Sequence, residues 1–240
     1  MEGRRVIPWA QLDAAQIPGG DGELRLMRRG AEFSIMLGNI ELMNSRLSGS
    51  EEALATLACE RIQARPQARI LIGGLGMGFT LRRALAVLDQ KARITVAELV
   101  PAVVAWARGP MAEVFGASLM DPRVVIEETD VGRLIRAGRT TYDAIVLDVD
   151  NGPQGLTRDA NDWLYQKAGL SAARLALRPG GVLAVWSSGP DRHFAPRLRG
   201  VGFQVDEVKL RANGPRGGAR HVVWLATRHE AGGGVSPANR

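Results

Sequence analysis

Arg69-Ile70-Leu71-Ile72-Gly73-Gly74-Leu75-Gly76-Met77-Gly78-Phe79-Thr80-Leu81 is the stretch that decides the fold of this 240-residue chain. Its apolar run breaks into glycines and then resumes with helical spacing, which is the pattern of a strand, a tight turn and a helix. Glycine suits such a turn because the backbone visits positive φ and because a side chain would keep the backbone away from a bound nucleoside. The stretch therefore predicts the first strand-turn-helix of a nucleotide-binding sheet, although glycine clusters also form ordinary turns.

Strand and helix patterns alternate downstream of this turn. Apolar runs predict further strands at residues 93–97, 124–127, 144–147, 182–186, 203–210 and 221–226. Helical patterns lie between them at residues 80–88, 102–114, 131–137, 161–177 and 194–199. Continuous apolar strands interleaved with helices predict an α/β fold, in which a parallel sheet is covered by helices on both faces. The last two strands, joined by a glycine-rich segment, predict a hairpin at the edge of that sheet.

The N-terminal part of the chain has a different pattern. Residues 1–20 show no clear periodicity and are predicted to form an extended lead-in. Short alternating runs at residues 23–27, 32–37 and 40–43 predict a small antiparallel meander. Ser48-Gly49-Ser50-Glu51 has the spacing of a helix capping box, so a helix is expected from there to just before Pro66, with Cys59 as a buried core residue.

These patterns divide the chain into three predicted parts. A β-rich segment with its linking helix covers residues 1–66, a Rossmann-like domain covers residues 67–228, and a disordered tail covers residues 229–240.

Composition and charge narrow the class of protein. Hydrophobic residues at 45% and charged residues at 23% are ordinary for a soluble globular chain, and no apolar stretch is long enough to span a bilayer. A single cysteine and the absence of a secretory signal pattern predict a cytoplasmic protein without a disulfide or a metal site. The net charge of +6 invites nucleic-acid binding, but the arginines are scattered, so the sequence does not favour it.

Acidic side chains stand where three of the predicted parallel strands end, and open parallel sheets bind ligands at that edge. Glu98 follows Gly78 by 20 residues, the spacing of a carboxylate that accepts hydrogen bonds from ribose hydroxyls, or it caps the next helix. Asp130 could accept from an adenine amino group or cap the helix that follows it. Asp148 and Asp150 form a pair of carboxylates, which is costly unless it is paired, hydrated or used, so a functional role is favoured.

Taken in order, the glycine turn, these acids and the segments Tyr142 to Asp148 and Leu177 to Val182 resemble the class I S-adenosylmethionine-dependent methyltransferase fold. The β-rich N-terminal unit and the acidic loop from Asp148 to Leu156 narrow the resemblance to the spermidine synthase-like (polyamine aminopropyltransferase) family. This resemblance implies a Rossmann-like, doubly wound sheet. It also implies a transferase of polyamine biosynthesis that is a cytoplasmic homodimer without a membrane partner.

The same resemblance implies a donor, an acceptor and a base. The donor is decarboxylated S-adenosylmethionine or S-adenosylmethionine, and the acceptor is a small amine or polyamine. Asp148 is the catalytic carboxylate that takes a proton from the attacking amine, and Asp150 is the second catalytic candidate, able to hold the distal end of a polyamine, with Asp159 and Asp162 as weaker candidates. The residues expected around the donor are Gly74, Leu75, Gly76, Gly78, Glu98, Leu99, Asp130, Val131 and Asp148.

Two alternatives to aminopropyl transfer stay open. Leu75-Gly76-Met77 stands where the family usually carries an aspartate that contacts the donor's amine, so nothing in the turn would repel a carboxylate. Methyl transfer from S-adenosylmethionine is therefore the second hypothesis, and a non-catalytic nucleoside-binding protein is the third. Trp163, Tyr165 and Trp186 could line an acceptor pocket, although packing is the commoner role of aromatic residues near the ends of elements. The histidines show no metal or Ser-His-Asp spacing.

Overall fold

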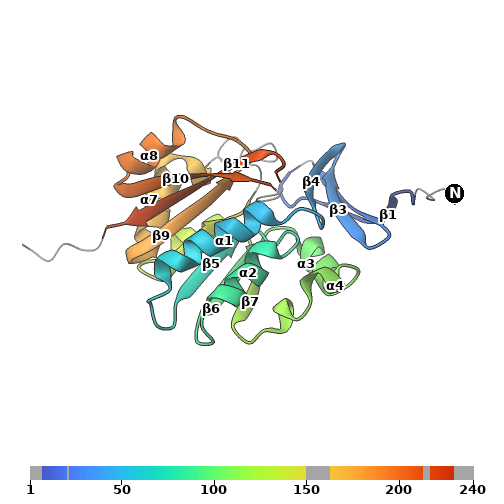
Figure 1. Ribbon diagram of the computed structural model, residues 1–240, viewed down its shortest axis with the longest axis horizontal. Helices are drawn as coiled ribbons and strands as arrows, with labels where there is room; N and C mark the ends of the chain where they lie inside the picture. The colour runs from blue at the N-terminus through green and yellow to red at the C-terminus, as the bar shows by residue number, and fades with distance from the viewer. Residues whose placement is uncertain (1–6, 21, 150–162, 213–216, 230–240) are drawn as a thin grey trace, which may run out of the picture.

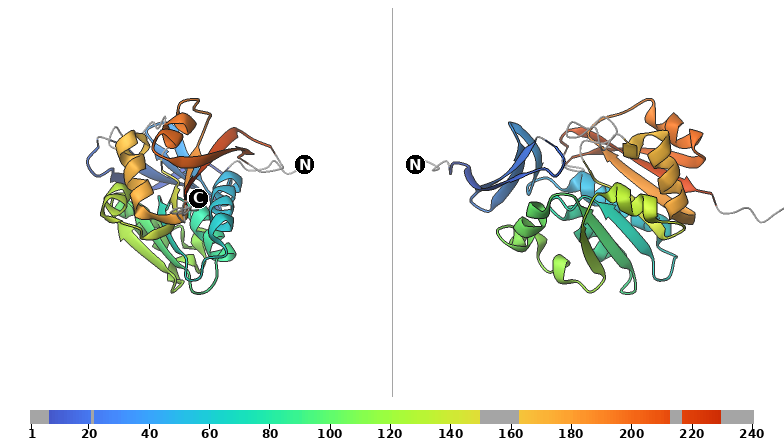
Figure 2. Two further views of the ribbon diagram at one scale, coloured as in Figure 1. Left: turned by 90° about the vertical axis from the view of Figure 1, so that its left-hand side faces the viewer. Right: turned by 180° about the vertical axis from the view of Figure 1, so that it is seen from behind.

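The computed structural model describes residues 7–20, 22–149, 163–212 and 217–229, which form two sheets (Figure 1). The small sheet is antiparallel, and its strands in order are β1 (Ala10–Gln16), β2 (Glu23–Arg29), β3 (Glu32–Leu37) and β4 (Ile40–Asn44). It lies to one side of the large sheet, near the N-terminus, in Figure 1 and in the right-hand view of Figure 2. The predicted N-terminal meander is confirmed.

The large sheet has seven strands in the order β10-β11-β9-β8-β5-β6-β7. Their bounds are β5 Arg69–Gly73, β6 Arg93–Glu98, β7 Val124–Glu128, β8 Tyr142–Leu147, β9 Leu177–Ser187, β10 Phe203–Arg211 and β11 Arg220–Arg228. The strands β9, β8, β5, β6 and β7 are parallel, and β11 pairs antiparallel with both β9 and β10. The carboxyl ends of the five parallel strands therefore lie together at one end of the strands. The predicted hairpin at the edge of the sheet is confirmed, because β10 is an outermost strand and pairs with β11.

Helices cover both faces of the large sheet, as predicted. On one face lie α1 (Gly49–Ile62), α2 (Phe79–Val87) and α3 (Pro101–Arg108), and on the other lie α5 (Val131–Ala137), α7 (Lys167–Ala176) and α8 (Phe194–Gly200). The first face shares its core with the small sheet, because Leu26 and Ile35 are fully buried in the same cluster as α1. The right-hand view of Figure 2, seen from behind, shows α5 and α7 in front of the sheet, on the face opposite to α1 and α2.

Three local predictions are wrong, each for a physical reason. The strand β1 forms within the residues predicted to be an extended lead-in. Its side chains are mostly exposed, so no burial pattern marks it in the sequence, and it pairs with β2. The helix predicted at 102–114 is two helices, α3 and α4 (Ala112–Phe115), because Gly109-Pro110 interrupts it. The capping box is not formed, since the side chain of Ser48 makes no capping hydrogen bond.

Two further boundaries differ from the prediction. The strand β9 begins at Leu177, five residues before its predicted start, and a register shift against β8 accommodates Pro179-Gly180-Gly181. Of the helix predicted at 161–177, α7 begins at Lys167, while residues 161 and 162 lie outside the described residues. The tail predicted from 229 lies outside them as well, except for His229.

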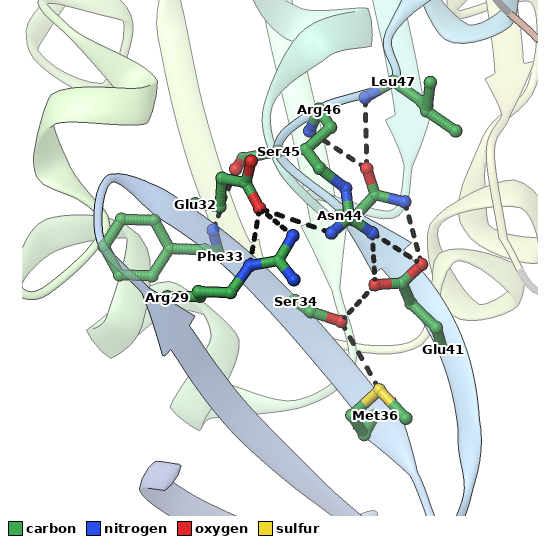
Figure 3. Close-up of polar contacts among 10 residues, drawn as sticks. All are labelled: Arg29, Glu32, Phe33, Ser34, Met36, Glu41, Asn44, Ser45, Arg46 and Leu47. Carbon is green, nitrogen blue, oxygen red and sulfur yellow. Dashed lines mark hydrogen bonds and ion pairs between the residues drawn. The ribbon is translucent and has the colours of Figure 1, made fainter. Parts of the chain in front are cut away.

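A polar network orders the passage from the small sheet to α1 (Figure 3). Arg46 pairs with Glu41 at 2.9 Å and with Glu32 at 3.4 Å, and the Ser34 hydroxyl donates to Glu41 at 2.7 Å. The side chain of Asn44 accepts from the backbone N–H groups of residues 46 and 47. Such partly exposed pairs add little stability each, but together they hold the chain that carries β4 into the first turn of α1.

The base of the sheet is held by Asp143, which is 1% exposed at the start of β8. Its carboxylate pairs with Arg65 at 2.9 Å and Arg178 at 3.0 Å, and it accepts from the backbone N–H of Arg69 at 2.8 Å. The acid thus joins the end of α1 to three strands, at the edge of the sheet opposite the predicted site.

We predict that Asp143→Asn lowers the free energy of unfolding by about 2 kcal/mol, because it removes a buried charge from between two arginines that are themselves partly exposed. Urea unfolding measures the loss. Asp206→Asn is the matched control, since Asp206 pairs with Arg61 at 2.8 Å on the surface and should cost less than about 0.5 kcal/mol. Equal losses in the two variants would contradict the anchoring role of Asp143.

Candidate active site

The glycine turn after β5 is attached to the ends of both neighbouring strands. Gly74 donates its N–H to the carbonyl of Ala97 at 2.9 Å, and Asp148 donates its N–H to the carbonyl of Gly73 at 3.0 Å. Gly74 has a φ of +91°, and a Cβ there would lie 2.4 Å from the carbonyl oxygen of Asp148. No other residue fits this position without moving the backbone.

Glu98 lies at the end of β6 and is only 8% exposed. One carboxylate oxygen accepts from the N–H of Leu75 and the other from the N–H of Val100, both at 2.9 Å. Burial raises the pKa of Glu98, and these backbone hydrogen bonds oppose that rise. Glu98 therefore holds the glycine turn in place, a contact that sequence reasoning does not find.

A cavity of about 780 Å³, including its open mouth, lies where the strand ends face the small sheet. It is lined by Ile17, Leu24, Leu42, Met43, Gly74, Gly76, Ala97, Glu98, Leu99, Val100, Val103, Thr129, Asp130, Val131, Asp148 and Val149. We call it the first cavity. Its mixture of apolar walls with a few acids suits a small-molecule ligand.

A second cavity of about 640 Å³, again including its mouth, adjoins the first. Its lining consists of Leu42, Met43, Glu51, Leu75, Gly76, Met77, Gly78, Phe79, Asp148 and Trp186. The two cavities share Leu42, Met43, Gly76 and Asp148, so Asp148 stands at their junction. Trp186 brings a buried Nε1 that has no hydrogen-bond partner among the described residues.

The structure brings together the donor-site residues that the sequence predicts. Seven of them line the first cavity, and Leu75 and Gly78 line the second. Asp130 also caps α5, because its carboxylate accepts from the N–H of Gly132 at 2.6 Å. Asp150, Asp159 and Asp162 lie outside the described residues. The ligand roles of all these residues stay predictions.

Asp148 has the protonation behaviour of a base that works near neutral pH. Burial, followed by the negative charge of Glu51, raises the pKa of Asp148 from 3.8 to about 7, while the hydroxyl of Thr80 donates to its carboxylate at 2.6 Å and opposes the rise. A base with a pKa near the working pH is the most effective one, since it is both available and strong enough to accept a proton.

Sequence reasoning misses Glu51 and His221, whereas Trp186, one of three aromatic residues that it offers for an acceptor pocket, lines the second cavity. The capping-box pattern concealed Glu51, whose carboxylate instead accepts from the Ser50 hydroxyl at 2.7 Å. Trp163 and Tyr165 line neither cavity, and Tyr165 donates to the carbonyl of Val149 at 3.2 Å. The prediction for Cys59 is confirmed, because it is fully buried in the core and burial raises its thiol pKa to about 12.

Two further findings concern the described residues as a whole. No three His, Cys, Asp or Glu side chains among them gather closely enough to hold a metal ion. Of the helices in this part of the chain, none has the length and hydrophobicity that a membrane crossing would need.

A doubly covered sheet with one reversed strand, and a cleft at the carboxyl ends of its parallel strands, define a protein of the class I methyltransferase-like fold. Solved structures share this fold. The spermidine synthase of Thermotoga maritima superposes with a TM-score of 0.70 at 19% identity, over 95% of this chain and 74% of that one. A spermidine synthase in complex with the transition state analogue AdoDATO gives 0.70 at 18% identity with the same coverage. A probable spermidine synthase from Corynebacterium glutamicum gives 0.64 at 16%, over 95% and 83% of the two chains.

Curated sequences agree with this fold. Polyamine aminopropyltransferase 1 of Streptomyces coelicolor is 32% identical over 135 residues, which are 55% of this chain and 24% of that protein. The polyamine aminopropyltransferase of Korarchaeum cryptofilum is 30% identical over 124 residues, 52% of this chain and 36% of that protein. The match thus spans about a quarter to a third of each relative. No protein-family model matches the chain. The predicted resemblance to spermidine synthase-like proteins is confirmed in sequence and in fold.

The raised pKa of Asp148 predicts that Asp148→Asn stabilises the protein at high pH. Because the folded pKa lies above the unfolded value, the contribution of this group to folding is fully present below pH 3.8 and is lost as the pH rises through about 7. We expect the variant to be more stable than the parent by about 2 kcal/mol near pH 8 and equally stable near pH 4. This gain is about half of what a pKa shift of three units gives in full, because the carboxyl group is partly solvated. Thermal unfolding at both pH values measures this, and a gain that does not depend on pH would contradict the shift.

Proposed function

We propose that this protein is a transferase that moves an aminopropyl group from decarboxylated S-adenosylmethionine to a small amine or polyamine. The observation that carries the proposal is the position of Asp148, a carboxylate that can take up a proton near neutral pH, at the junction of the two cavities. The names of the relatives support the same reaction.

The proposed donor lies in the first cavity with its nucleoside against the glycine turn. Glu98 accepts hydrogen bonds from the ribose hydroxyls, and Asp130 accepts from the adenine amino group. Gly74 lies against the end of β8 and has no side chain, so no side chain projects from the turn at that point. The sulfonium then points to Asp148, where the cavities meet.

The reaction needs an unprotonated amine. The acceptor ammonium in the second cavity gives a proton to the carboxylate of Asp148, and the nitrogen lone pair attacks the donor carbon attached to the sulfonium. The C–N bond forms as the C–S bond breaks, and the sulfur takes the bonding electron pair to become a neutral thioether. Asp148 holds the proton until solvent removes it.

Charge favours the decarboxylated donor. The second cavity receives the carboxylates of Glu51 and Asp148, so a ligand arm ending in an ammonium group is attracted there, while a carboxylate would be repelled. Methyl transfer from S-adenosylmethionine stays the second candidate, because Leu75-Gly76-Met77 carries no acid that would by itself exclude the carboxylate. A binding protein without activity is the third.

We expect decarboxylated S-adenosylmethionine to bind at least about tenfold more tightly than S-adenosylmethionine, which corresponds to about 1.4 kcal/mol. Calorimetric titration with both donors and with methylthioadenosine measures the preference, and mass analysis after adding polyamines identifies the group transferred. Preference for the carboxylated donor with a methylated product would replace the first proposal by the second. Nucleoside binding without any product would leave the third, and absence of binding would refute all of them.

Two variants in the same experiment test the site. Asp148→Asn should abolish transfer and keep methylthioadenosine affinity within about twofold, because the side chain acts on the amine. Glu98→Ala should weaken methylthioadenosine binding by about tenfold or more, as expected for lost hydrogen bonds to a charged group. Glu128→Ala is the matched control, since Glu128 ends the neighbouring strand β7 but is exposed. Equal affinities of the Glu98 and Glu128 variants would remove the ribose role.

A cytoplasmic homodimer is the proposed state of the protein. Support comes from exposed apolar side chains on and beside the small sheet, namely Ile7, Leu12, Ile40 and Leu47, which are 37% to 57% exposed. Sedimentation at micromolar concentration should give the mass of two chains, and Ile40→Lys should lower the dimer fraction. A monomer under these conditions would refute the dimer.

A further inference from the structure

Glu51 is an acid in the first turn of α1 whose side chain is directed away from the cap of the helix. Its carboxylate takes no part in a capping box. Instead its side chain reaches the wall of the second cavity, which it shares with Asp148. Burial raises the pKa of Glu51 as well, and the neighbouring charge of Glu52 adds to the rise. A half-buried carboxyl group directed into a cavity beside another one is costly to the fold unless it is used.

A chain of side chains from three elements holds Glu51 in this place. The hydroxyl of Ser50, which is 1% exposed, donates to Glu51 at 2.7 Å, and its oxygen lies 2.9 Å from Nδ1 of His221 on β11. Since the single hydroxyl proton goes to Glu51, Nδ1 of His221 is the donor to Ser50. The imidazole packs edge-on against Trp186 of β9, with the ring centres 4.8 Å apart.

The residues that hold Glu51 in place do not neutralise its negative charge. Burial lowers the pKa of His221, so the imidazole is neutral near pH 7 and adds no positive charge. Two groups act directly on the pKa of Asp148, namely Glu51 on α1 and the Thr80 hydroxyl on α2, and of these two Glu51 brings the charge. Glu98 and Asp130 share the first cavity with Asp148.

We propose that Glu51 is a positioning residue for the proposed transfer, whose negative charge, held at the cavity wall by Ser50 and His221, makes Asp148 a stronger base toward an ammonium substrate. The inference rests on the proposed function and deepens it, because it assigns the substrate of the second cavity as a cationic amine. It also explains why Ser50, Glu51 and His221 are hydrogen-bonded to one another beside Asp148.

The size of the effect follows from the proton transfer itself. An alkylammonium group has a pKa of about 10.4 and an ordinary aspartate has a pKa of about 3.9, so the two pKa values differ by about 6.5. With the pKa of Asp148 at about 7 the difference falls to roughly three units. Part of this gain comes from burial and part from Glu51, so removing the Glu51 charge should return part of it.

The test compares Glu51→Gln with the parent protein over a range of pH. The acidic limb of the pH profile of kcat/KM reports the base in the free enzyme, and we expect it to move to lower pH by about one unit. Above this limb kcat should fall about three- to tenfold because the base is weaker, while methylthioadenosine affinity stays within about twofold. Glu51→Asp should restore part of both effects, and Ser50→Ala should show them in smaller measure.

Glu60→Gln is the matched control, since it makes the same chemical change on the exposed side of α1 and should leave the profile unchanged. A fall in kcat at all pH values without a shift of the limb would show that Glu51 acts only on structure, and an unchanged profile would show that it has no role. Either result would overturn the inference and leave the proposed function standing.

A second measurement separates the inference from the function. The titration of the Asp148 carboxyl carbon can be followed by NMR in the protein without substrate, and its midpoint should fall in Glu51→Gln but not in Glu60→Gln. If the parent protein transfers no group, the proposed function fails, and this titration still decides whether Glu51 tunes Asp148. Equal midpoints in the parent and the Glu51 variant would refute the tuning.

Discussion

The close approach of Gly74 to the end of β8 is the constraint on which the rest of the site depends. A side chain at Gly74 would lie 2.4 Å from the carbonyl oxygen of Asp148, so only glycine allows the turn to touch that strand. On its other side the turn is bound to β6, through the carbonyl of Ala97 and the carboxylate of Glu98. Three strand ends are thereby held together, and both cavities open beside them.

The second feature of the site is the set of acids gathered in a protein of net charge +6. Glu51, Glu98 and Asp148 all have raised pKa values, and burial is the first cause in each case. Their settings nevertheless differ. Glu98 is hydrogen-bonded to two backbone N–H groups, whereas Asp148 has the Thr80 hydroxyl and a negative neighbour. The first arrangement suits a fixed binding group and the second suits a group that exchanges a proton.

Much of the fold was predictable because its signals are local. The apolar strands from Arg69 onward and the glycine turn have patterns that follow directly from burial on both faces and from positive φ. The strand β1 was not predictable, since its side chains are mostly exposed and its pairing with β2 leaves no local burial pattern. Glu51 was misjudged for a related reason: its spacing from Ser48 matches a local motif, and only the position of α1 beside the strand ends directs it to Asp148.

The sequence by itself determined the class of fold, the glycine turn and the acids at the strand ends, because each of these features depends on residues that are close together along the chain. Only the tertiary structure decided what those acids face. The small sheet brings Leu42 and Met43 over the cleft, α1 brings Glu51, and β11 brings His221 to Ser50, 171 residues away along the chain. Protonation depends on such neighbours and on burial, which are properties of the packed molecule and not of any local pattern.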